Sequence, residues 1–284
     1  MERIGTVREI WRYPVKSMGG ESLSHCNAGV KGISGDRGWA LRDEVAGEVR
    51  GAKKLPQLLL CQARYLAEPV GDDVPPAELT LPDGARLRSD DSATSARLSE
   101  LLGRPVTICS RRPASDRDHY RRAAPDDPDF FAEMRQIFGR LDDEPLPDLT
   151  VFPPEILEFT SPLGTYFDAF PVHVLTTATI EALGGAPKFD RRRFRPNFFI
   201  ETDGAARGLV ETEWCGRTIR IGGLRLAIQM PTVRCVMTTL PQPDLAKDPS
   251  VLRTIVRDAG QNVGVYATVV DGGAVAVGDA LEVE

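Results

Sequence analysis

The sequence predicts a mainly β fold with a few helices (the α+β class), arranged as two β-rich modules. Proline and glycine are frequent, with 22 and 26 residues in a chain of 284, which is typical of many turns between short strands. Apolar and polar residues alternate on both sides of Asp-Gly or Gly-Gly dipeptides, which suit tight hairpin turns. A charged, proline-broken stretch separates two such strand-rich halves.

Three segments predict β-hairpins because the alternation continues across a turn dipeptide. They are residues 79–89, 217–228 and 267–284. Since successive side chains of a strand point to opposite faces, each alternation predicts one row facing the core. The last segment is expected to turn at Asp271-Gly272 and to bury Val275, Val277, Leu281 and Val283.

Three other segments predict helices that end at glycine. They are residues 91–103, 176–185 and 248–260. The last has the clearest signals: Asp248 as the N-cap, Pro249 at the first helical position and Gly260 as the stop.

Residues 111–150 predict a boundary between the modules, because this stretch is rich in charges and broken by prolines. We expect an N-terminal module over 1–112, a charged linker or docking segment over 113–150 and a second module over 151–284. Composition favours a solvated connector, with residues 130–138 as a candidate docking helix.

Composition also excludes several classes of protein. A net charge of −6 argues against a protein that coats nucleic acid, which would be basic. The five cysteines are scattered without a CxxC pair, so neither a disulfide framework nor a four-thiolate metal site is expected. We find no secretory signal and no apolar run of membrane-spanning length, which predicts a cytoplasmic protein.

Two short N-terminal stretches contain candidate anion-binding residues. In YPVKSM, Pro14 should end a strand and leave Lys16 and Ser17 at its rim, where a lysine beside a hydroxyl can hold an anion. The alternative is a lysine in an ordinary surface turn. In GISGDRGW, Arg37 could clamp a phosphate with two hydrogen bonds, or Asp36 and Arg37 could stabilise the turn by bonding each other.

The stretch RRRFRPNFFIE concentrates four arginines within residues 191–195. A solvated charged face is the default interpretation, and nucleic-acid contact is another. Pro196 stiffens the approach to a buried strand at 198–200. It would thereby hold Arg195 and the Asn197 amide in fixed positions at the mouth of that strand.

The stretch PTVRCVMTT contains the candidate reactive thiol. Pro231 is expected to end a strand, so that the following loop carries Thr232, Arg234 and Cys235. A neighbouring guanidinium favours the thiolate, the form of cysteine that binds soft metals or attacks electrophiles. Inert packing is the alternative for a lone cysteine. A Cys-His nucleophile lacks local support at any of the three histidines.

Six motifs occur in the order found in one known family. They are IWRYPVKSMGGESL, GDRGWAL, RRFRPNFFIETDG, WCGRTIRIGGLRLAI, PTVRCVMTT and NVGVYATVVDGGAVAVGDALEV. Together they resemble the MOSC family, named after the C-terminal domain of molybdenum cofactor sulfurase, preceded by its N-terminal β-barrel module. Within the family, the chain looks most like the amidoxime-reducing components. The resemblance therefore implies an N-terminal β-barrel module followed by a MOSC-type β-barrel domain.

The resemblance also implies a molybdenum–pterin cofactor, with Cys235 as the protein's sulfur ligand to the metal and the catalytic cysteine. The positions that match cofactor contacts are Lys16, Ser17, Arg37, Asp168, Arg195, Asn197, Thr232 and Arg234. Arg37 matches the contact to the pterin phosphate, and residues 171–173 match a segment lining the same cavity. Molybdenum ion and pyridoxal phosphate binding are further properties that the resemblance implies.

The activity implied is the reduction of N-hydroxylated small molecules (amidoximes, hydroxylamines and N-hydroxylated bases) by oxygen-atom transfer. The chain has no cysteine cluster for an iron–sulfur centre. Electrons are therefore expected from a separate protein of the reductase, ferredoxin or cytochrome type. Neither membrane nor nucleic acid is expected as a partner.

Two alternatives stay open at the level of sequence. Cys235 could carry a persulfide in the maturation of metal cofactors, or the chain could be a noncatalytic barrel that binds nucleotide or nucleic acid through residues 191–195. One departure from the family concerns specificity. Leu240-Pro241-Gln242 follows the threonine pair, where relatives often have a valine and an acidic residue, which leaves the substrate preference open.

Overall fold

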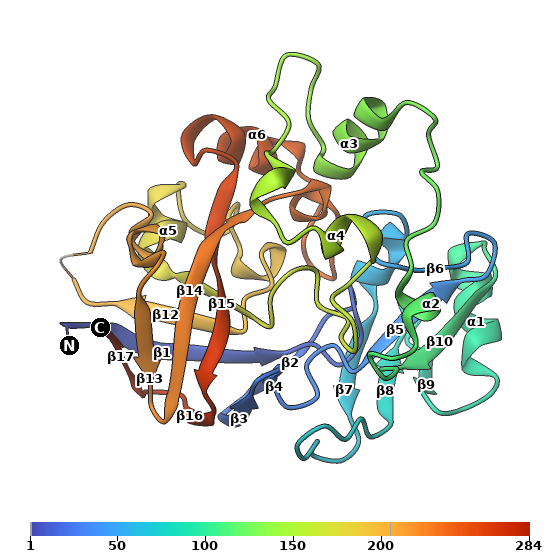
Figure 1. The fold of residues 1–284 in the computed structure, drawn as a ribbon, viewed down its shortest axis with the longest axis horizontal. Helices are drawn as coiled ribbons and strands as arrows, with labels where there is room; N and C mark the ends of the chain where they lie inside the picture. Colours follow the sequence, from blue (N-terminus) through green and yellow to red (C-terminus); the bar gives the residue numbers. More distant parts are fainter. Residues whose placement is uncertain (1, 205) are drawn as a thin grey trace.

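A closed barrel forms the larger part of the protein, whose computed structural model describes residues 2–204 and 206–284. Its sheet has the order β12-β11-β15-β14-β13-β17-β1-β2, and β1 also pairs with β12, so seven strands close the barrel (Figure 1). The strands are β12 (Phe198–Thr202), β11 (Val172–Thr176), β15 (Asn262–Asp271), β14 (Leu224–Val233), β13 (Thr218–Ile221), β17 (Ala280–Val283), β1 (Glu2–Arg12) and β2 (Glu21–Leu23).

Two three-stranded sheets form the smaller part around a second core. One contains β10 (Val106–Ser110), β5 (Trp39–Asp43) and β6 (Glu48–Arg50), and the other contains β7 (Gln62–Tyr65), β8 (Ala77–Thr80) and β9 (Arg86–Arg88). A third small sheet joins β16 (Gly273–Ala276), β3 (His25–Gly29) and β4 (Gly32–Ile33). This last sheet contains strands from both ends of the chain.

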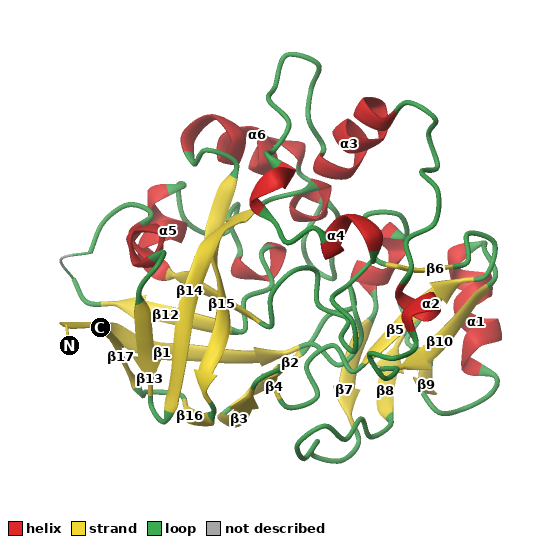
Figure 2. Cartoon of the chain, in the orientation of Figure 1, coloured by secondary structure: helices red, strands yellow, loops and turns green. Residues whose placement is uncertain are grey.

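Helices are short and lie around the sheets (Figure 2). The α-helices of the described residues are α1 (Thr94–Leu102), α2 (Arg117–Tyr120), α3 (Phe130–Phe138), α4 (Glu155–Glu158), α5 (Thr177–Ala182) and α6 (Pro249–Asp258). The 3-10 helices are η1 (Pro56–Leu60), η2 (Leu149–Val151), η3 (Arg191–Arg193), η4 (Val210–Trp214) and η5 (Val236–Thr239). The predicted fold class, mainly β with a few helices, is therefore confirmed.

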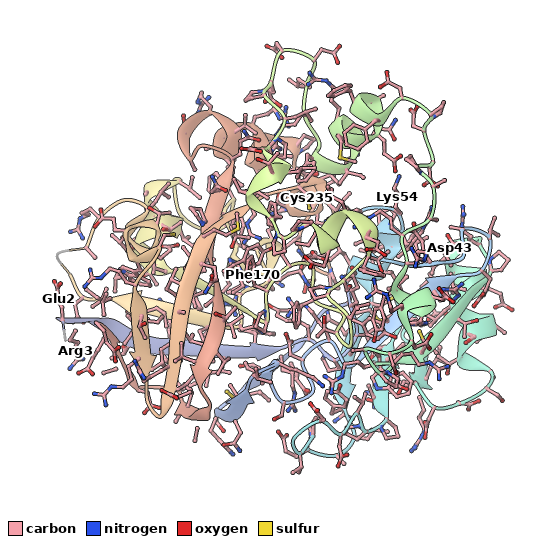
Figure 3. The ribbon with its side chains drawn as sticks, viewed as in Figure 1. Glu2, Arg3, Asp43, Lys54, Phe170 and Cys235 are labelled. Carbon is pink, nitrogen blue, oxygen red and sulfur yellow. The ribbon has the colours of Figure 1, made fainter. Side chains whose placement is uncertain are left out.

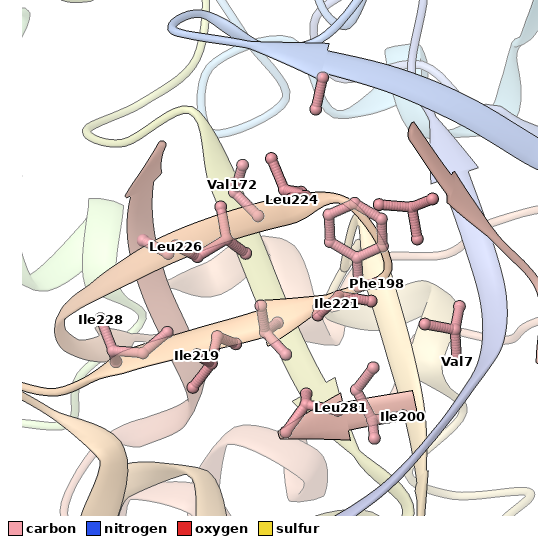
Figure 4. Close-up of a cluster of buried hydrophobic side chains, with 14 of the residues drawn as sticks. Val7, Val172, Phe198, Ile200, Ile219, Ile221, Leu224, Leu226, Ile228 and Leu281 are labelled. Atoms are coloured by element: carbon pink, nitrogen blue, oxygen red, sulfur yellow. The ribbon is translucent and has the colours of Figure 1, made fainter. Parts of the chain in front are cut away.

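The barrel interior is filled by branched apolar side chains from all seven strands (Figure 4). Val7 and Ile10 of β1 lie in this core beside Phe198 and Ile200 of β12. Fully burying each such side chain contributes roughly 1.5–3 kcal/mol, which makes the barrel a rigid frame. The first strand of the chain thus completes a barrel whose other strands come from residues 172–283.

The predicted helices form where their terminal signals lie. The Asp248 side chain accepts a hydrogen bond from the Ser250 amide at 2.9 Å, and Pro249 begins α6. Gly103 ends α1 with a φ of 62°, a left-handed conformation that glycine adopts readily. The candidate docking helix over 130–138 also forms, as α3.

The predicted C-terminal hairpin is wrong in its pairing. β15 is followed by β16, but β16 pairs with β3, and β17 pairs with β13 and β1. Val277 lies in the turn between β16 and β17 and is 47% exposed rather than buried. The turn dipeptide therefore bends the chain correctly, while tertiary pairing decides which strand each segment joins.

The strand end predicted at Pro231 is also wrong, because β14 continues to Val233. Pro231 pairs with Val265 between two register shifts, at Ile228/Met230 and Pro231/Val233. A bulged strand loses ladder bonds locally, so the missing N–H of proline costs little there. Thr232 therefore lies within β14, in the barrel wall, and the strand ends at Val233, shortly before Cys235.

Candidate functional site

A cavity of about 160 Å³ lies where the barrel meets the smaller part of the molecule. Figure 3 shows Cys235 near the centre, with Asp43 on the side of the smaller part and Glu2 at the far end of the barrel. Lining residues come from the loop after β1, the turn before β5, the loop before β11, the segment from η3 to β12, and the end of β14. Residues distant in sequence thus share one hollow.

The cavity is strongly basic. Six cationic side chains line it: Lys16, Arg37, Lys53, Arg193, Arg195 and Arg234. Within the described chain, the one carboxylate among its lining residues is Asp168. Such an excess of positive charge in a concave site favours an anionic ligand.

Three of the lining residues adopt left-handed backbone conformations although none is glycine. The φ angles are 70° for Ser17, 50° for Arg37 and 57° for Arg195, a conformation that costs of order 1–3 kcal/mol and clusters at functional sites. Local bonds hold two of them, since the Arg37 amide donates to Tyr13 O at 2.7 Å and the Ala52 amide donates to Ser17 Oγ at 2.9 Å. The backbone therefore fixes where these side chains point.

Arg195 is a buried cation without a carboxylate partner among the described residues. It is only 9% exposed, and its guanidinium carbon lies 4.1 Å from the centre of the Tyr13 ring. Its Nη2 is buried without a hydrogen bond, and burial lowers the pKa of Arg195 to about 10. An uncompensated buried charge is costly, so this position is suited to an anion.

Arg234 is a second buried arginine of the same cavity. Its Nη2 lies 3.1 Å from His173 Nε2 and donates to Phe194 O at 3.1 Å, while its Nε has no partner in the described chain. Burial lowers the pKa of Arg234 to about 10. Burial, and then the charge of Arg234, hold the pKa of His173 well below its usual value, so the imidazole is neutral and can accept from the arginine.

Lys16 and Asp168 form the polar pair at the rim. Lys16 Nζ donates to Asp168 Oδ1 at 2.6 Å and to Tyr166 O at 2.7 Å. Burial lowers the pKa of Lys16. Although burial raises the pKa of Asp168, the charges of Lys16 and Lys53 outweigh it and hold that pKa well below its usual value. The carboxylate is therefore ionised, and the pair keeps the lysine at the cavity.

Cys235 precedes η5 and is half-buried in the cavity wall. Its thiol makes no hydrogen bond to any residue of the described ranges. The backbone of the preceding residue, Arg234, is fixed by hydrogen bonds. Arg140 Nη2 donates to Arg234 O at 3.0 Å and to Gln261 Oε1 at 2.9 Å, and the Arg234 amide donates to Gln261 O at 2.8 Å. The loop thus fixes the position of a thiol whose sulfur is left available.

Asn197 and Thr232 lie behind the cavity rather than among its lining residues. Asn197 Nδ2 donates to Asp36 Oδ2 at 3.1 Å, and its Oδ1 accepts from the His173 amide at 3.1 Å. Asp36 forms an ion pair with Arg37, so the self-bonded turn is present and Arg37 also lines the cavity. Thr232 is fully buried, and its Oγ1 has no partner among the described residues.

The arginine run is not the solvated face expected by default. Arg193 and Arg195 are buried, Arg191 pairs with Glu9 and Arg192 pairs with Asp190. Because η3 turns the chain at this point, alternate arginines are directed inward. The run therefore supplies cations to the cavity.

The linker is likewise not a purely solvated connector. Phe138 and Arg140 are buried, and Phe138 lines the cavity together with Leu149 and Phe152. Sequence reasoning also missed Lys53, Arg193 and Tyr266 as lining residues. Arg193 lies in the arginine run and Tyr266 in a family motif, but neither segment shows which of its residues faces the cavity, and the sequence around Lys53 contains no distinguishing signal.

The residues described contain no group of three or more histidine, cysteine, aspartate or glutamate side chains that could hold a metal ion. A metal in this cavity would therefore have to arrive with most of its ligands. No helix within 2–204 or 206–284 is long and apolar enough to cross a membrane.

Comparison with known proteins gives two family matches. The profile described as the MOSC N-terminal beta barrel domain matches residues 4–98, and the MOSC domain profile matches residues 165–282. Mitochondrial amidoxime-reducing component 1 of Mus musculus is 26% identical over 267 residues, which cover 86% of this chain and 68% of that protein.

Two solved structures are also similar. The YuaD protein of Bacillus subtilis has a TM-score of 0.43 and 12% identity, covering 99% of this chain and 95% of its own. YiiM from Geobacillus stearothermophilus has a TM-score of 0.31 and 19% identity, covering 40% of this chain and 54% of its own.

Proposed function

Because the chain belongs to the MOSC domain family, we propose that its basic cavity binds a molybdenum–pterin cofactor and that the protein reduces N-hydroxylated small molecules. One observation carries the proposal: two buried guanidinium groups without a carboxylate partner in the described chain line the same cavity as an available thiol. Arg195 and Arg234 favour the binding of an anion. The sulfur of Cys235 is a soft ligand that can bind a metal.

The residues present fit such a cofactor. Its phosphate would find cations in Arg37, Arg195 and Arg234, and arginine suits phosphate because its donors are arranged as a fork. The pterin brings a dithiolene for the metal, so one protein sulfur suffices, in agreement with the lack of a metal-ligand cluster in the described chain. Cys235 would be that sulfur.

When bound, the cofactor would supply two-electron oxygen-atom transfer. The chain's own residues hold and orient the reactants. Asp168, ionised and at the rim, can accept a hydrogen bond from a substrate N–H. Burial raises the pKa of Tyr266 to about 12, so this cavity phenol keeps its proton at neutral pH and can donate a hydrogen bond to the substrate oxygen. The two protons that the reduction of an N–O bond consumes would come from water.

The remaining expectations stay predictions. They are a separate electron-transfer partner of the reductase, ferredoxin or cytochrome type, a cytoplasmic location, and pyridoxal phosphate binding. The amidoxime-reducing relative is 26% identical, which supports the substrate class without fixing the individual substrate.

The proposal can be tested on protein from a cofactor-competent host by X-ray absorption at the molybdenum edge. We expect about one molybdenum per chain, and one fewer sulfur neighbour in Cys235→Ser than in wild type. Benzamidoxime reduction should fall at least about 100-fold, because even residues that only support metal ligands typically contribute 10–100-fold. Cys215→Ser, at a thiol packed against the barrel core, is the matched control and should match wild type.

An unchanged sulfur count in Cys235→Ser would remove the cysteine from the metal. Persulfide transfer would be favoured instead if metal-free wild-type protein released sulfur with cyanide and Cys235→Ser did not. The first outcome would contradict the role of Cys235 as metal ligand, and the second would contradict the reductase assignment.

A further inference from the structure

A second cavity of about 280 Å³ lies beside the first, between α3, η2 and α4. Its walls are mainly apolar, with Phe130, Phe131, Met134, Leu146, Pro147 and Leu157. We refer to it as the apolar groove. In Figure 1, α3 lies at the upper right of the molecule and α4 lies below it, nearer the centre.

Phe138 and Leu149 line both the apolar groove and the basic cavity. The two spaces are therefore separated by little more than these two side chains. On the cavity side, the same segment contributes Phe152 and Ile156. Together the two adjoining spaces, which we call the central hollow, have a cationic wall from the barrel and the loops of the smaller part, and an apolar wall from residues 130–157.

The groove keeps large apolar side chains in contact with water. Phe130 is 50% exposed, Phe131 66% and Leu157 60%. Clustered exposure of this kind is unfavourable unless something covers it, and it marks ligand-binding grooves or interfaces. Here the shared wall decides between them, because an occupant of the groove would contact Phe138 and Leu149, which also line the cavity that contains Cys235.

We propose that the apolar groove is a substrate subsite that takes the aryl or alkyl body of an N-hydroxylated molecule. The N–O group of that molecule reaches the cavity beside Cys235. This inference rests on the proposed function for the identity of the reacting group, although not for the binding of the apolar body.

The size of the groove fits this occupant. A cavity of about 150 Å³ holds a benzene ring, so 280 Å³ accommodates a ring with a short alkyl chain. The groove therefore selects small molecules with an extended apolar end.

Benzamidoximes with para substituents from methyl to butyl test the proposal. We expect kcat/KM of wild-type protein to rise about fourfold per added methylene, the factor that corresponds to ~0.8 kcal/mol per buried CH₂. Phe131→Ser and Leu157→Ser should flatten this series while leaving the reduction of free hydroxylamine unchanged. Leu157→Trp, which fills the groove, should lower kcat/KM for only the longer members of the series.

The matched control is Leu141→Ser. Leu141 is 55% exposed and lines neither cavity, so the variant should keep the wild-type chain-length dependence. All three substituted positions are exposed, and thermal melting checks that each of the four variants folds.

A second readout does not require catalysis. Calorimetry with 4-butylbenzamide, which cannot be reduced at an N–O bond, should show binding to wild type and to Leu141→Ser, with affinity at least tenfold lower in the Phe131→Ser, Leu157→Ser double variant. If this holds but no benzamidoxime is reduced, the groove is retained and the proposed function fails. Reduction without chain-length dependence would contradict the proposal that the groove is a substrate subsite. The same holds for a wild-type dimer that the double variant converts to monomer.

Discussion

The two walls of the central hollow differ in chemistry and in what holds them in place. The cationic wall rests on the barrel and the loop after β1, and three of its residues are held at positive φ. The apolar wall belongs to the segment from α3 to α4, where several large side chains are exposed. A fixed, charged wall suits a ligand that is bound once and kept. A less buried apolar wall suits molecules that enter and leave.

The largest effect is expected at Arg195, where the cationic wall is least compensated. Arg195→Met should raise the free energy of unfolding of cofactor-free protein by about 1–3 kcal/mol, because it removes a buried charge that lacks a partner. The same change should lower the cofactor content of the purified protein. Thermal melting and molybdenum analysis measure the two effects separately.

The two predicted changes have opposite signs, since the stability of the cofactor-free protein should rise while its cofactor content should fall. This combination distinguishes an anion site from a guanidinium that stabilises the fold. Arg191→Met is the matched control, because Arg191 is paired with Glu9 and does not line the cavity. A destabilised cofactor-free Arg195→Met protein would mean that the guanidinium stabilises the fold, and it would contradict the account of an anion site.

An effect of similar size on stability, but a smaller one on cofactor content, is expected at Arg140, which connects residues 113–150 to the loop of Cys235. Arg140→Leu removes hydrogen bonds to Arg234 O and Gln261 Oε1, and we expect a loss of about 1.5–3 kcal/mol of stability. The loosened Cys235 should then react faster with a thiol reagent in cofactor-free protein. Arg135→Leu is the control, since the Arg135 side chain bonds, among the described residues, only Leu141 O and Glu144 O. An unchanged thiol reaction rate in Arg140→Leu would remove its positioning role.

The smallest effect concerns the pH dependence of the Lys16–Asp168 pair. The folded-state pKa of Asp168 is depressed, so its stabilising contribution is fully present above its unfolded value near 4 and is lost as pH falls through the folded pKa. Because the side chain is 47% exposed, screening limits the contribution to roughly 1 kcal/mol or less.

Denaturant unfolding of Asp168→Asn measures this contribution. The stability difference from wild type should be constant from pH 7 to about pH 5, and it should shrink progressively as the pH falls below about 4. A difference that grew on acidification would reverse the sign and contradict the pairing.

The sequence alone predicted the fold class, the helices at 91–103 and 248–260, and the strand entering at Phe198, because these depend on local periodicity and terminal residues. It failed where tertiary pairing decides. Asp271-Gly272 predicted a hairpin, yet β16 pairs with β3, and Pro231 stays within β14 because bulges flank it. Local signals set the turns, whereas strand partners depend on distant segments.

The candidate site divides in the same way. Lys16, Arg37, Arg195 and Cys235 come from motifs with unusual local chemistry, and the structure brings them to one cavity. Part of the apolar wall, including Phe152 and Leu157, lies in the predicted second module, and the rest lies in residues 113–150, whose composition predicted a connector. Phe138 and Leu149 are ordinary apolar residues there, and only their packing over the cavity gives them a place in the site. Their roles, like those of the cationic residues, are open to the experiments above.

A crystal structure of the cofactor-loaded protein, with anomalous data collected at the molybdenum edge, tests the central claim most directly. We predict one anomalous peak bonded to Cys235 Sγ, with the cofactor phosphate against Arg195 and Arg234. A molybdenum peak outside this cavity, or one inside it with Cys235 unbonded, would contradict the account.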